Sequence, residues 1–183
     1  VRFVLSAISA TFTPVISDLY HKGRLEELQR LFATTTRWII TLSLPIVLVL
    51  VLFPEPLLGL YGPDFRVGAT MLMVLAPAMF INGGVGAAGL MLQMADHERI
   101  ALANNVLLAV LNVILNWWMI ATYGPIGAAM ATGLSVALVN LLKLAEVRYL
   151  LGMHPYNRAY LKPFAAAVVA AAAGWAIDLS LQA

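Results

Sequence analysis

Long apolar stretches alternate along this sequence with short polar or turn-rich clusters. The clearest pair lies within residues 103–140, where two stretches free of formal charge meet at Tyr123, Gly124 and Pro125. A helix rises 1.5 Å per residue, so about 20 residues cross the roughly 30 Å hydrocarbon core of a bilayer. The pattern therefore predicts a transmembrane helical hairpin.

Charged and turn-rich clusters divide the whole chain in the same way. They give six predicted membrane helices, at about residues 1–18, 38–60, 67–94, 100–122, 126–147 and 162–182. Between the first two, residues 21–37 carry leucines at helical spacing against charged side chains, which predicts a short amphipathic helix at the membrane interface. The sequence thus predicts an all-α polytopic membrane protein.

Composition supports this class and excludes several kinds of chemistry. Hydrophobic residues make up 62% of the chain and charged residues 11%, whereas soluble domains carry about 25% charge. The chain has no cysteine, so disulfides, thiolate metal sites and cysteine nucleophiles are excluded. It begins at Val1, inside a predicted membrane helix, so we expect it to be a piece of a longer protein.

Basic residues gather at alternate ends of the predicted spans. One side holds Lys22, Arg24, Arg30, Arg37, Arg99, Lys143, Arg148, Arg158 and Lys162, and the other holds Arg2 and Arg66. Cytoplasmic loops retain lysine and arginine, so we expect residues 21–37, 95–99 and 148–161 in the cytoplasm and residues 62–66 and 123–125 outside. The external connections are too short to hold a domain, so we expect function within the bilayer or at its inner face.

Polar side chains form stripes on two of the spans. Ser6, Ser9 and Thr13 lie three and four residues apart, and Asn105, Asn112 and Asn116 lie seven and four apart. Residues at these spacings share one face of a helix. Each stripe either lines an aqueous cavity or forms hydrogen bonds within and between helices. The candidates for cavity lining are Ser6, Ser9, Thr13, Asn82, Asn105, Asn112 and Asn116.

The third span is longer than one bilayer crossing needs. It contains Pro77 and then the run Asn82-Gly83-Gly84-Val85-Gly86, so we expect it to be strongly tilted or broken near its middle. Pro77, Gly83 and Gly84 are the hinge candidates, and a kink that serves packing alone is the alternative. In the fifth span, Ala129, Gly133 and Ala137 recur every four residues, which predicts close helix packing.

Residues that could carry catalysis are few. No charge lies at the centre of a predicted span, and Lys143 and Glu146 lie near the cytoplasmic end of the fifth, where their side chains reach the interface. The loop Asp96-His97-Glu98-Arg99 resembles acid/base or metal chemistry, but neighbouring side chains on a short loop rarely converge on one ligand. His21 and His154 have no partners at ligand spacing. We therefore expect no catalytic, metal or cofactor site and no nucleic-acid partner.

The order of these features resembles a known family. The resemblance rests on three segments in order: TPVISDLYHKGRLEELQRL, then LPIVLVLVLFPEPLLGLYGPDF, then GLMLQMADHERIALANNVLLAVLNVILNWWMIATYGPIGAAMAT. This succession resembles the C-terminal half of bacterial polysaccharide-biosynthesis flippases, the oligosaccharide and O-antigen transporters of the multidrug/oligosaccharidyl-lipid/polysaccharide superfamily. The resemblance covers nearly the whole chain and is most specific at residues 54–65 and 123–132.

The resemblance implies a transporter of the inner membrane with two six-helix bundles around a central cavity. Such a protein moves a polyprenyl-pyrophosphate-linked glycan to the outer leaflet by alternating access. On that template residues 1–148 hold five helices of the second bundle, residues 149–161 a cytoplasmic linker, and residues 162–183 a truncated accessory transmembrane helix. The N-terminal bundle, where the resemblance places pyrophosphate-binding and coupling residues, would be a missing partner of this chain.

Other functions stay open at this point. A lipid II flippase or a multidrug exporter of the same superfamily differs in residues that this chain does not hold. The membrane anchor of a polyprenyl-phosphate glycosyltransferase would need carboxylates for a sugar phosphate and a metal, and only the 96–99 loop and Asp64 could supply them. A non-transporting structural subunit is a third alternative.

Overall fold

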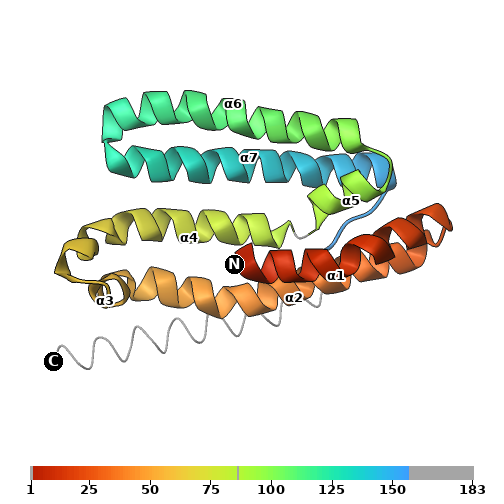
Figure 1. The fold of residues 1–183 in the computed structure, drawn as a ribbon, viewed down its shortest axis with the longest axis horizontal. Helices are drawn as coiled ribbons and strands as arrows, with labels where there is room; N and C mark the ends of the chain where they lie inside the picture. The colour runs from red at the N-terminus through yellow and green to blue at the C-terminus, as the bar shows by residue number, and fades with distance from the viewer. Residues whose placement is uncertain (1, 86, 157–183) are drawn as a thin grey trace.

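A computed structural model describes residues 2–85 and 87–156, with side chains from residue 12 onward. The regular elements in these ranges are all helices (Figure 1). They are α1 (Arg2–His21), α2 (Leu25–Leu52), α3 (Pro54–Gly59), the 3-10 helix η1 (Pro63–Gly68), α4 (Ala69–Gly84), α5 (Ala88–Met94), α6 (Glu98–Tyr123) and α7 (Pro125–Leu151). The all-α prediction is confirmed for this part of the chain.

Four segments of the described chain are long and apolar enough to cross a membrane. They are α2, the stretch Pro63–Met94 that includes α4 and α5, α6, and α7. This confirms the polytopic membrane character that the apolar pattern predicts. The first predicted span corresponds to α1, a helix of 20 residues, and the span predicted at residues 162–182 lies outside the described residues.

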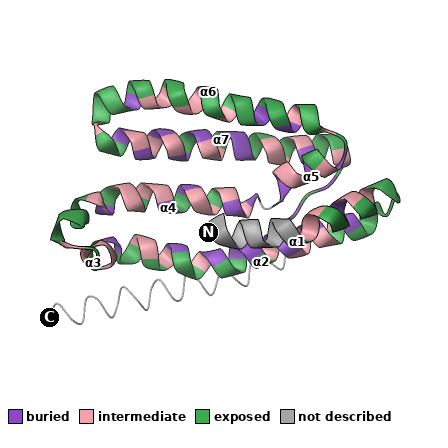
Figure 2. Cartoon of the chain, in the orientation of Figure 1, coloured by how far each residue is buried: buried purple, intermediate pink, exposed green. Residues whose placement is uncertain are grey.

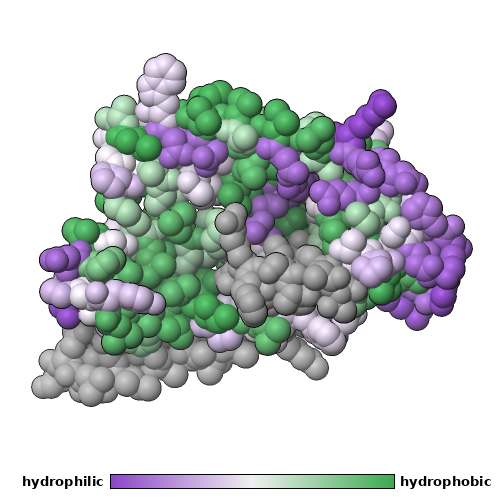
Figure 3. Space-filling view, viewed as in Figure 1, coloured by the Kyte–Doolittle hydropathy of each residue, from purple (hydrophilic) through white to green (hydrophobic). Residues whose placement is uncertain are grey.

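The long helices lie side by side in the order α6, α7, α4, α2, and α1 packs against α2 (Figure 1). The connections at residues 22–24, 95–97 and 152–156 all lie at one end of this layer, which we call the basic end. The turns around η1 and Gly124 lie at the opposite end. Figure 3 shows hydrophilic side chains gathered at the basic end, over the α1–α2 turn. The loops therefore alternate between ends as the basic residues suggest.

Helix α2 differs from the prediction of a separate amphipathic helix at residues 21–37 and a span at residues 38–60. It is continuous from Leu25 to Leu52 and ends at Phe53, before Pro54 begins α3. The buried face of its first turns, Leu28 and Phe32, continues without interruption into Ile39. No glycine or proline lies between the charged first turns of α2 and its apolar part after Arg37. The side chains therefore change from polar to apolar along α2, while the backbone stays helical.

The largest buried side chains gather at the basic end. Leu28 and Phe32 of α2, Met91 and Leu92 of α5, and Val147 of α7 are at most 1% exposed and belong to one core (Figure 2). Nearer the opposite end, α4 and α7 pack through small residues instead. A Cβ added at Gly133 would lie 3.0 Å from the Cβ of Ala78, as the small-residue repeat in the fifth predicted span suggests.

The turn between α6 and α7 is closed most tightly at Gly127. A Cβ added there would overlap the carbonyl oxygen of Met119 and lie 2.9 Å from the nitrogen of Ile120. Both are backbone atoms and cannot move independently of α6. Only glycine therefore lets the two helices meet directly after their turn.

Gly127→Ala is expected to destabilise the α6–α7 hairpin by about 1–3 kcal/mol, because overpacking against backbone forces the helices apart. The measurement is the thermal unfolding midpoint of the full-length protein in detergent. Gly68→Ala is the matched control, since its added Cβ would meet only a Leu58 methyl group at 3.6 Å. Equal midpoints for the two variants would contradict this account of the turn.

Candidate functional site

Helix α7 carries three polar residues at three-residue spacing in its basic half, Asn140, Lys143 and Glu146. They contact Asn82 of α4 and the neighbouring Asn104 and Asn105 of α6. We call these six residues the α7 polar cluster. Residues three apart lie on adjacent flanks of a helix, so one side of α7 presents polar groups to both of its neighbours.

Opposite charges of α7 meet consecutive amides of α6. Asn104 Nδ2 donates a hydrogen bond to Glu146 Oε2, and Lys143 Nζ donates one to Asn105 Oδ1 at 3.3 Å. Asn104 is 2% exposed, whereas Asn105 is exposed. The buried amide therefore holds the carboxylate, and the exposed amide lies beside the ammonium group.

On its other flank, α7 is bonded to α4. Asn140 Nδ2 donates to Asn82 Oδ1 at 2.9 Å and to the carbonyl oxygen of Val136 at 2.8 Å. Asn82 lies two residues before the end of α4, which is Gly84. This hydrogen bond therefore ties α7 to the last turn of α4, directly before the helix breaks.

The broken helix lies beside Lys143. Between Gly84 and Ala88 the chain leaves the α-helix, and α5 continues at an angle to α4 (Figure 1). A Cβ added at Gly89 would lie 3.7 Å from Lys143 Cδ and 3.8 Å from its Nζ. The lysine side chain thus crosses the first turn of α5, and the cluster touches both halves of the broken helix.

The cluster lies away from the ends of its helices. Six residues separate Asn104 from the start of α6, and eight separate Lys143 from the end of α7, which correspond to about 9 Å and about 12 Å of helix. The expectation that the Lys143 and Glu146 side chains reach the interface stays a prediction. Each forms a hydrogen bond with an amide of α6 within a segment able to cross the membrane, and charges at such positions are functional candidates.

Of the other two predicted asparagines of α6, Asn112 contacts α7 and Asn116 bonds to Asn112 within α6. Asn112 Nδ2 donates to Thr132 Oγ1 at 3.5 Å, and Asn116 Nδ2 donates to the Asn112 carbonyl at 2.8 Å and to Asn112 Oδ1 at 3.0 Å. Both asparagines are half-buried. These contacts favour helix packing for Asn112 and Asn116, and a role in lining a cavity stays a prediction.

The remaining candidates lie on α1 and α4. Ser6 and Ser9 are in the part of α1 whose side chains are not described, and Thr13 is half-buried further along this helix. Helix α4 continues past Pro77 and ends at Gly84, so the break follows the glycines. The predicted hinge role of Pro77, Gly83 and Gly84 is not tested by this geometry.

The loop at residues 95–99 shows no convergence of ligands. Asp96 has a φ of 60°, and its Oδ2 lies 3.7 Å from Nε2 of the exposed His21. Within residues 2–85 and 87–156, no group of three or more histidine, aspartate and glutamate side chains is placed to hold a metal ion. Asp96 thus meets an exposed histidine and not a group of converging ligands.

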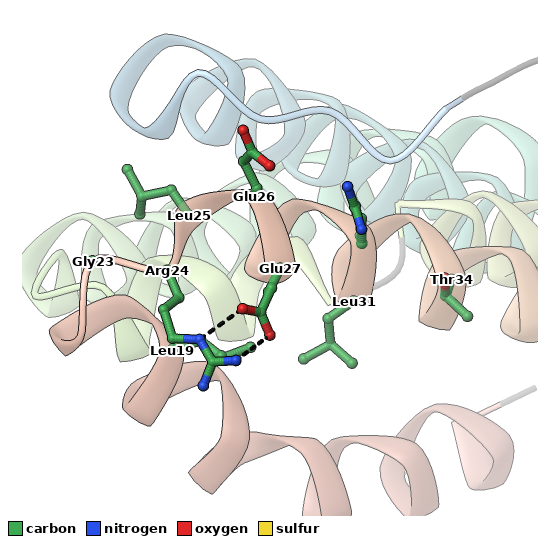
Figure 4. Close-up of a pocket in the computed structure, with 9 residues that line it drawn as sticks. Leu19, Gly23, Arg24, Leu25, Glu26, Glu27, Leu31 and Thr34 are labelled. Carbon is green, nitrogen blue, oxygen red and sulfur yellow. Dashed lines mark hydrogen bonds and ion pairs between the residues drawn. The ribbon is translucent and has the colours of Figure 1, made fainter.

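A hollow lies on the surface at the basic end, between α1 and α2 (Figure 4). It measures about 710 Å³ and is lined by Leu19, Gly23, Arg24, Leu25, Glu26, Glu27, Arg30, Leu31 and Thr34. Arg24 donates to both carboxylate oxygens of Glu27, at 2.7 and 2.6 Å. Exposed ion pairs of this kind contribute little stability, and Arg24 and Glu27 in this hollow already neutralise each other.

The sequence interpretation did not include Asn104, Asn140, Lys143 and Glu146 among the candidate site residues. Two signals were available: an amide directly beside Asn105, and the spacing of three between residues 140, 143 and 146. Neither indicates which helix faces which. The partners are 42 and 58 residues apart, so only the packed fold brings them together.

Residues 1–118 match the MatE family. The chain belongs to the MatE family. The matched range includes Asn82, Asn104 and Asn105 of the polar cluster and ends within α6, so α7 lies beyond it. The part of the chain that the structure describes has four segments long and apolar enough to cross a membrane, so this MatE chain is a multi-pass membrane protein.

Two relatives of this MatE chain come from Haloferax volcanii. It is 26% identical over 137 residues to the probable low-salt glycan biosynthesis flippase Agl15, and 30% identical over 145 residues to the probable flippase AglR. These alignments cover 74% and 76% of the chain but only 29% and 30% of the relatives. The chain therefore spans about a third of their length. No solved structure gives a significant match.

The Asn104–Glu146 contact should show strong energetic coupling, because either partner alone leaves a buried polar group without its hydrogen bond. A double-mutant cycle of Asn104→Ala and Glu146→Ala is expected to give a coupling energy of about 1.5–3 kcal/mol. The measurement is unfolding of the full-length protein in detergent.

The control cycle is Asn112→Ala with Thr132→Ala, whose neutral contact at 3.5 Å should couple by about 0.6 kcal/mol, the average for neutral pairs in membranes. Coupling at residues 104 and 146 no larger than in this control would contradict the assignment of a charge-assisted bond.

Proposed function

We propose that this MatE chain is part of a flippase that moves a lipid-linked oligosaccharide across the plasma membrane by alternating access. It would form five helices of the second of two bundles, with the first bundle elsewhere in the same protein. The observation that carries the proposal is the α7 polar cluster, which joins Lys143 and Glu146, on a segment able to cross a membrane, to a broken helix. Both curated relatives bear the name flippase, and one is named for glycan biosynthesis.

A broken helix gives the chain a place to change shape within the membrane. Non-helical backbone is tolerated at membrane depth only where protein or a cavity satisfies its polar groups. Here Asn82 and Asn140 bond to each other beside the break, and Lys143 crosses the first turn of α5. The Gly84 carbonyl at the break accepts a hydrogen bond from the Tyr156 hydroxyl, and the polar side chains beside it suit a change in the angle between α4 and α5.

The cluster also offers groups that suit a glycan. Asn105 is exposed and lines a hollow of about 310 Å³ with Gln93, Met94, Glu98 and Leu102. Amide and carboxylate side chains pair with sugar hydroxyls, which both donate and accept hydrogen bonds. This surface supports a carbohydrate-bearing substrate better than the apolar cargo of a multidrug exporter. Ser6, Ser9, Thr13, Asn112 and Asn116 stay candidates for the same cavity.

A catalytic alternative has less support. A polyprenyl-phosphate glycosyltransferase needs carboxylates that converge on a metal and a sugar phosphate, and Asp96 and Glu98 lie exposed on separate sides of a short loop and helix start. Membership of the MatE family and the relatives' names indicate a membrane transporter. We therefore propose transport as the activity of the whole protein, with the basic end in the cytoplasm.

Lys143→Met in the full-length protein is expected to lower oligosaccharide translocation by at least about tenfold, because it removes the charge that balances Glu146 beside the break. The measurement is protection of a fluorescent lipid-linked oligosaccharide in proteoliposomes from an impermeant quencher. Arg30→Met, a change of the same kind on the exposed surface of α2, is the matched control.

If the wild-type protein translocates the oligosaccharide and Lys143→Met does so at the same rate, the polar cluster has no role in transport. If the wild-type protein translocates no lipid-linked oligosaccharide, the proposed substrate class fails.

A further inference from the structure

The segment after α7 turns back across the basic end of the molecule. Helix α7 ends at Leu151, and Gly152 adopts a left-handed φ of 66° that reverses the chain direction. Met153 and Pro155 are then buried, whereas His154 and Tyr156 remain exposed. We call residues 152–156 the strap. Its alternation of buried and exposed side chains shows that the strap packs on the bundle along its length.

Gln29 of α2 holds the strap by its backbone. Gln29 Nε2 donates to the carbonyl oxygen of His154 at 2.5 Å, and the His154 N–H donates to Gln29 Oε1 at 3.1 Å. The two residues are 125 positions apart in the sequence. A primary amide is the side-chain group that can donate and accept at once in this way. The contact therefore depends on the identity of residue 29 and not on that of residue 154.

Tyr156 bonds the strap to the broken helix. Its hydroxyl donates to the carbonyl oxygen of Gly84 at 3.1 Å. Gly84 is the last residue of α4, and the last carbonyls of a helix lack partners within it. A tyrosine hydroxyl is protonated at neutral pH and able to donate, and partial burial raises the pKa of Tyr156 further in the same direction. The strap thus caps the end of α4 at the break.

Apolar packing reinforces both hydrogen-bonded contacts. Met153 is 4% exposed and belongs to the same core as Val85, Ala87 and Ala88, the residues on either side of the break, and as Leu28 of α2. The strap consequently joins three parts that are distant in sequence: the start of α2, the break, and the end of α7.

We propose that the strap is a latch that holds the basic end closed, and that Gln29 must release the backbone of His154 before the break and α2 can separate. The inference rests on the proposed function, because alternating access requires this end to open. Three hydrogen bonds and the buried Met153 and Pro155 hold the latch, and substrate opens it if substrate binds the open state more tightly than the closed one. The cost of opening is thus set locally, at the contacts of the strap.

The latch can be tested without a transport assay. Val85→Cys places a thiol at a position only 3% exposed beneath the strap, in a full-length protein whose other cysteines, where present, are replaced by serine. Adding Gln29→Ala should raise the rate of labelling by a hydrophilic maleimide about tenfold, because both hydrogen bonds to His154 are lost. Tyr156→Phe should raise it by a smaller factor, because it removes one bond.

Glu26→Ala is the matched control, since Glu26 is exposed one turn before Gln29. Its labelling rate should equal that of Val85→Cys alone. Rates that are the same in Gln29→Ala, Tyr156→Phe and Glu26→Ala would overturn the latch.

A double variant, Gln29→Cys with His154→Cys, tests the link to transport by replacing the Gln29 hydrogen bonds with a reversible covalent tether. The two cysteines are joined by a short bifunctional thiosulfonate, and oligosaccharide translocation is measured before joining, after joining and after reduction. The latch predicts that translocation stops on joining and returns on reduction. Unchanged translocation in the joined protein would overturn it.

The two proposals fail differently in this experiment. Absence of translocation in the unjoined protein counts against the flippase function, and the labelling rates at residue 85 then decide the latch alone.

Discussion

The hydrogen bonds between the charged pair of α7 and two consecutive amides of α6 constrain the rest of the arrangement. Lys143 and Glu146 lie on a segment able to cross a membrane, where an uncompensated charge costs about 2.5–3.5 kcal/mol or more at the centre. Asn104 and Asn105 supply the partners. Sliding α6 against α7 by a single turn would break both contacts. The pair therefore fixes the register of the hairpin, and Gly127 lets its turn close in that register.

The α6–α7 hairpin also positions the broken helix formed by α4 and α5. Asn140 extends the polar flank of α7 to Asn82, so α4 is placed relative to α7 up to its final turn. Beyond the break, α5 packs into the apolar core at the basic end, with Leu28, Met91 and Val147. Small residues such as Gly133 and Ala78 allow close contact nearer the opposite end. One end of the bundle is consequently held by large apolar side chains and the other by close backbone approach, with the break between them.

The sequence predicts the membrane helices well, because apolar runs and the Tyr-Gly-Pro turn report local properties of the backbone. It also predicts an interruption near Asn82 to Gly84, since consecutive glycines weaken any helix. It predicts a boundary between two helices at residues 37 and 38, but α2 is continuous there. A change from polar to apolar side chains does not by itself end a helix. The partners of Asn104 and Gln29 could not be predicted, since they lie 42 and 125 residues away and depend on how the helices pack.

The central claim is that the chain changes shape at the break while the α6–α7 hairpin keeps its register. Backbone hydrogen exchange tests this most directly, in the full-length protein in lipid nanodiscs with and without a lipid-linked oligosaccharide. The account predicts that substrate alters exchange at residues 85–88 by at least about threefold and leaves α6 and α7 unchanged near Asn104 and Glu146. Asn140→Leu should remove that local response. Equal changes along α6, α7 and the break, or no change at residues 85–88 in a protein that transports, would contradict it.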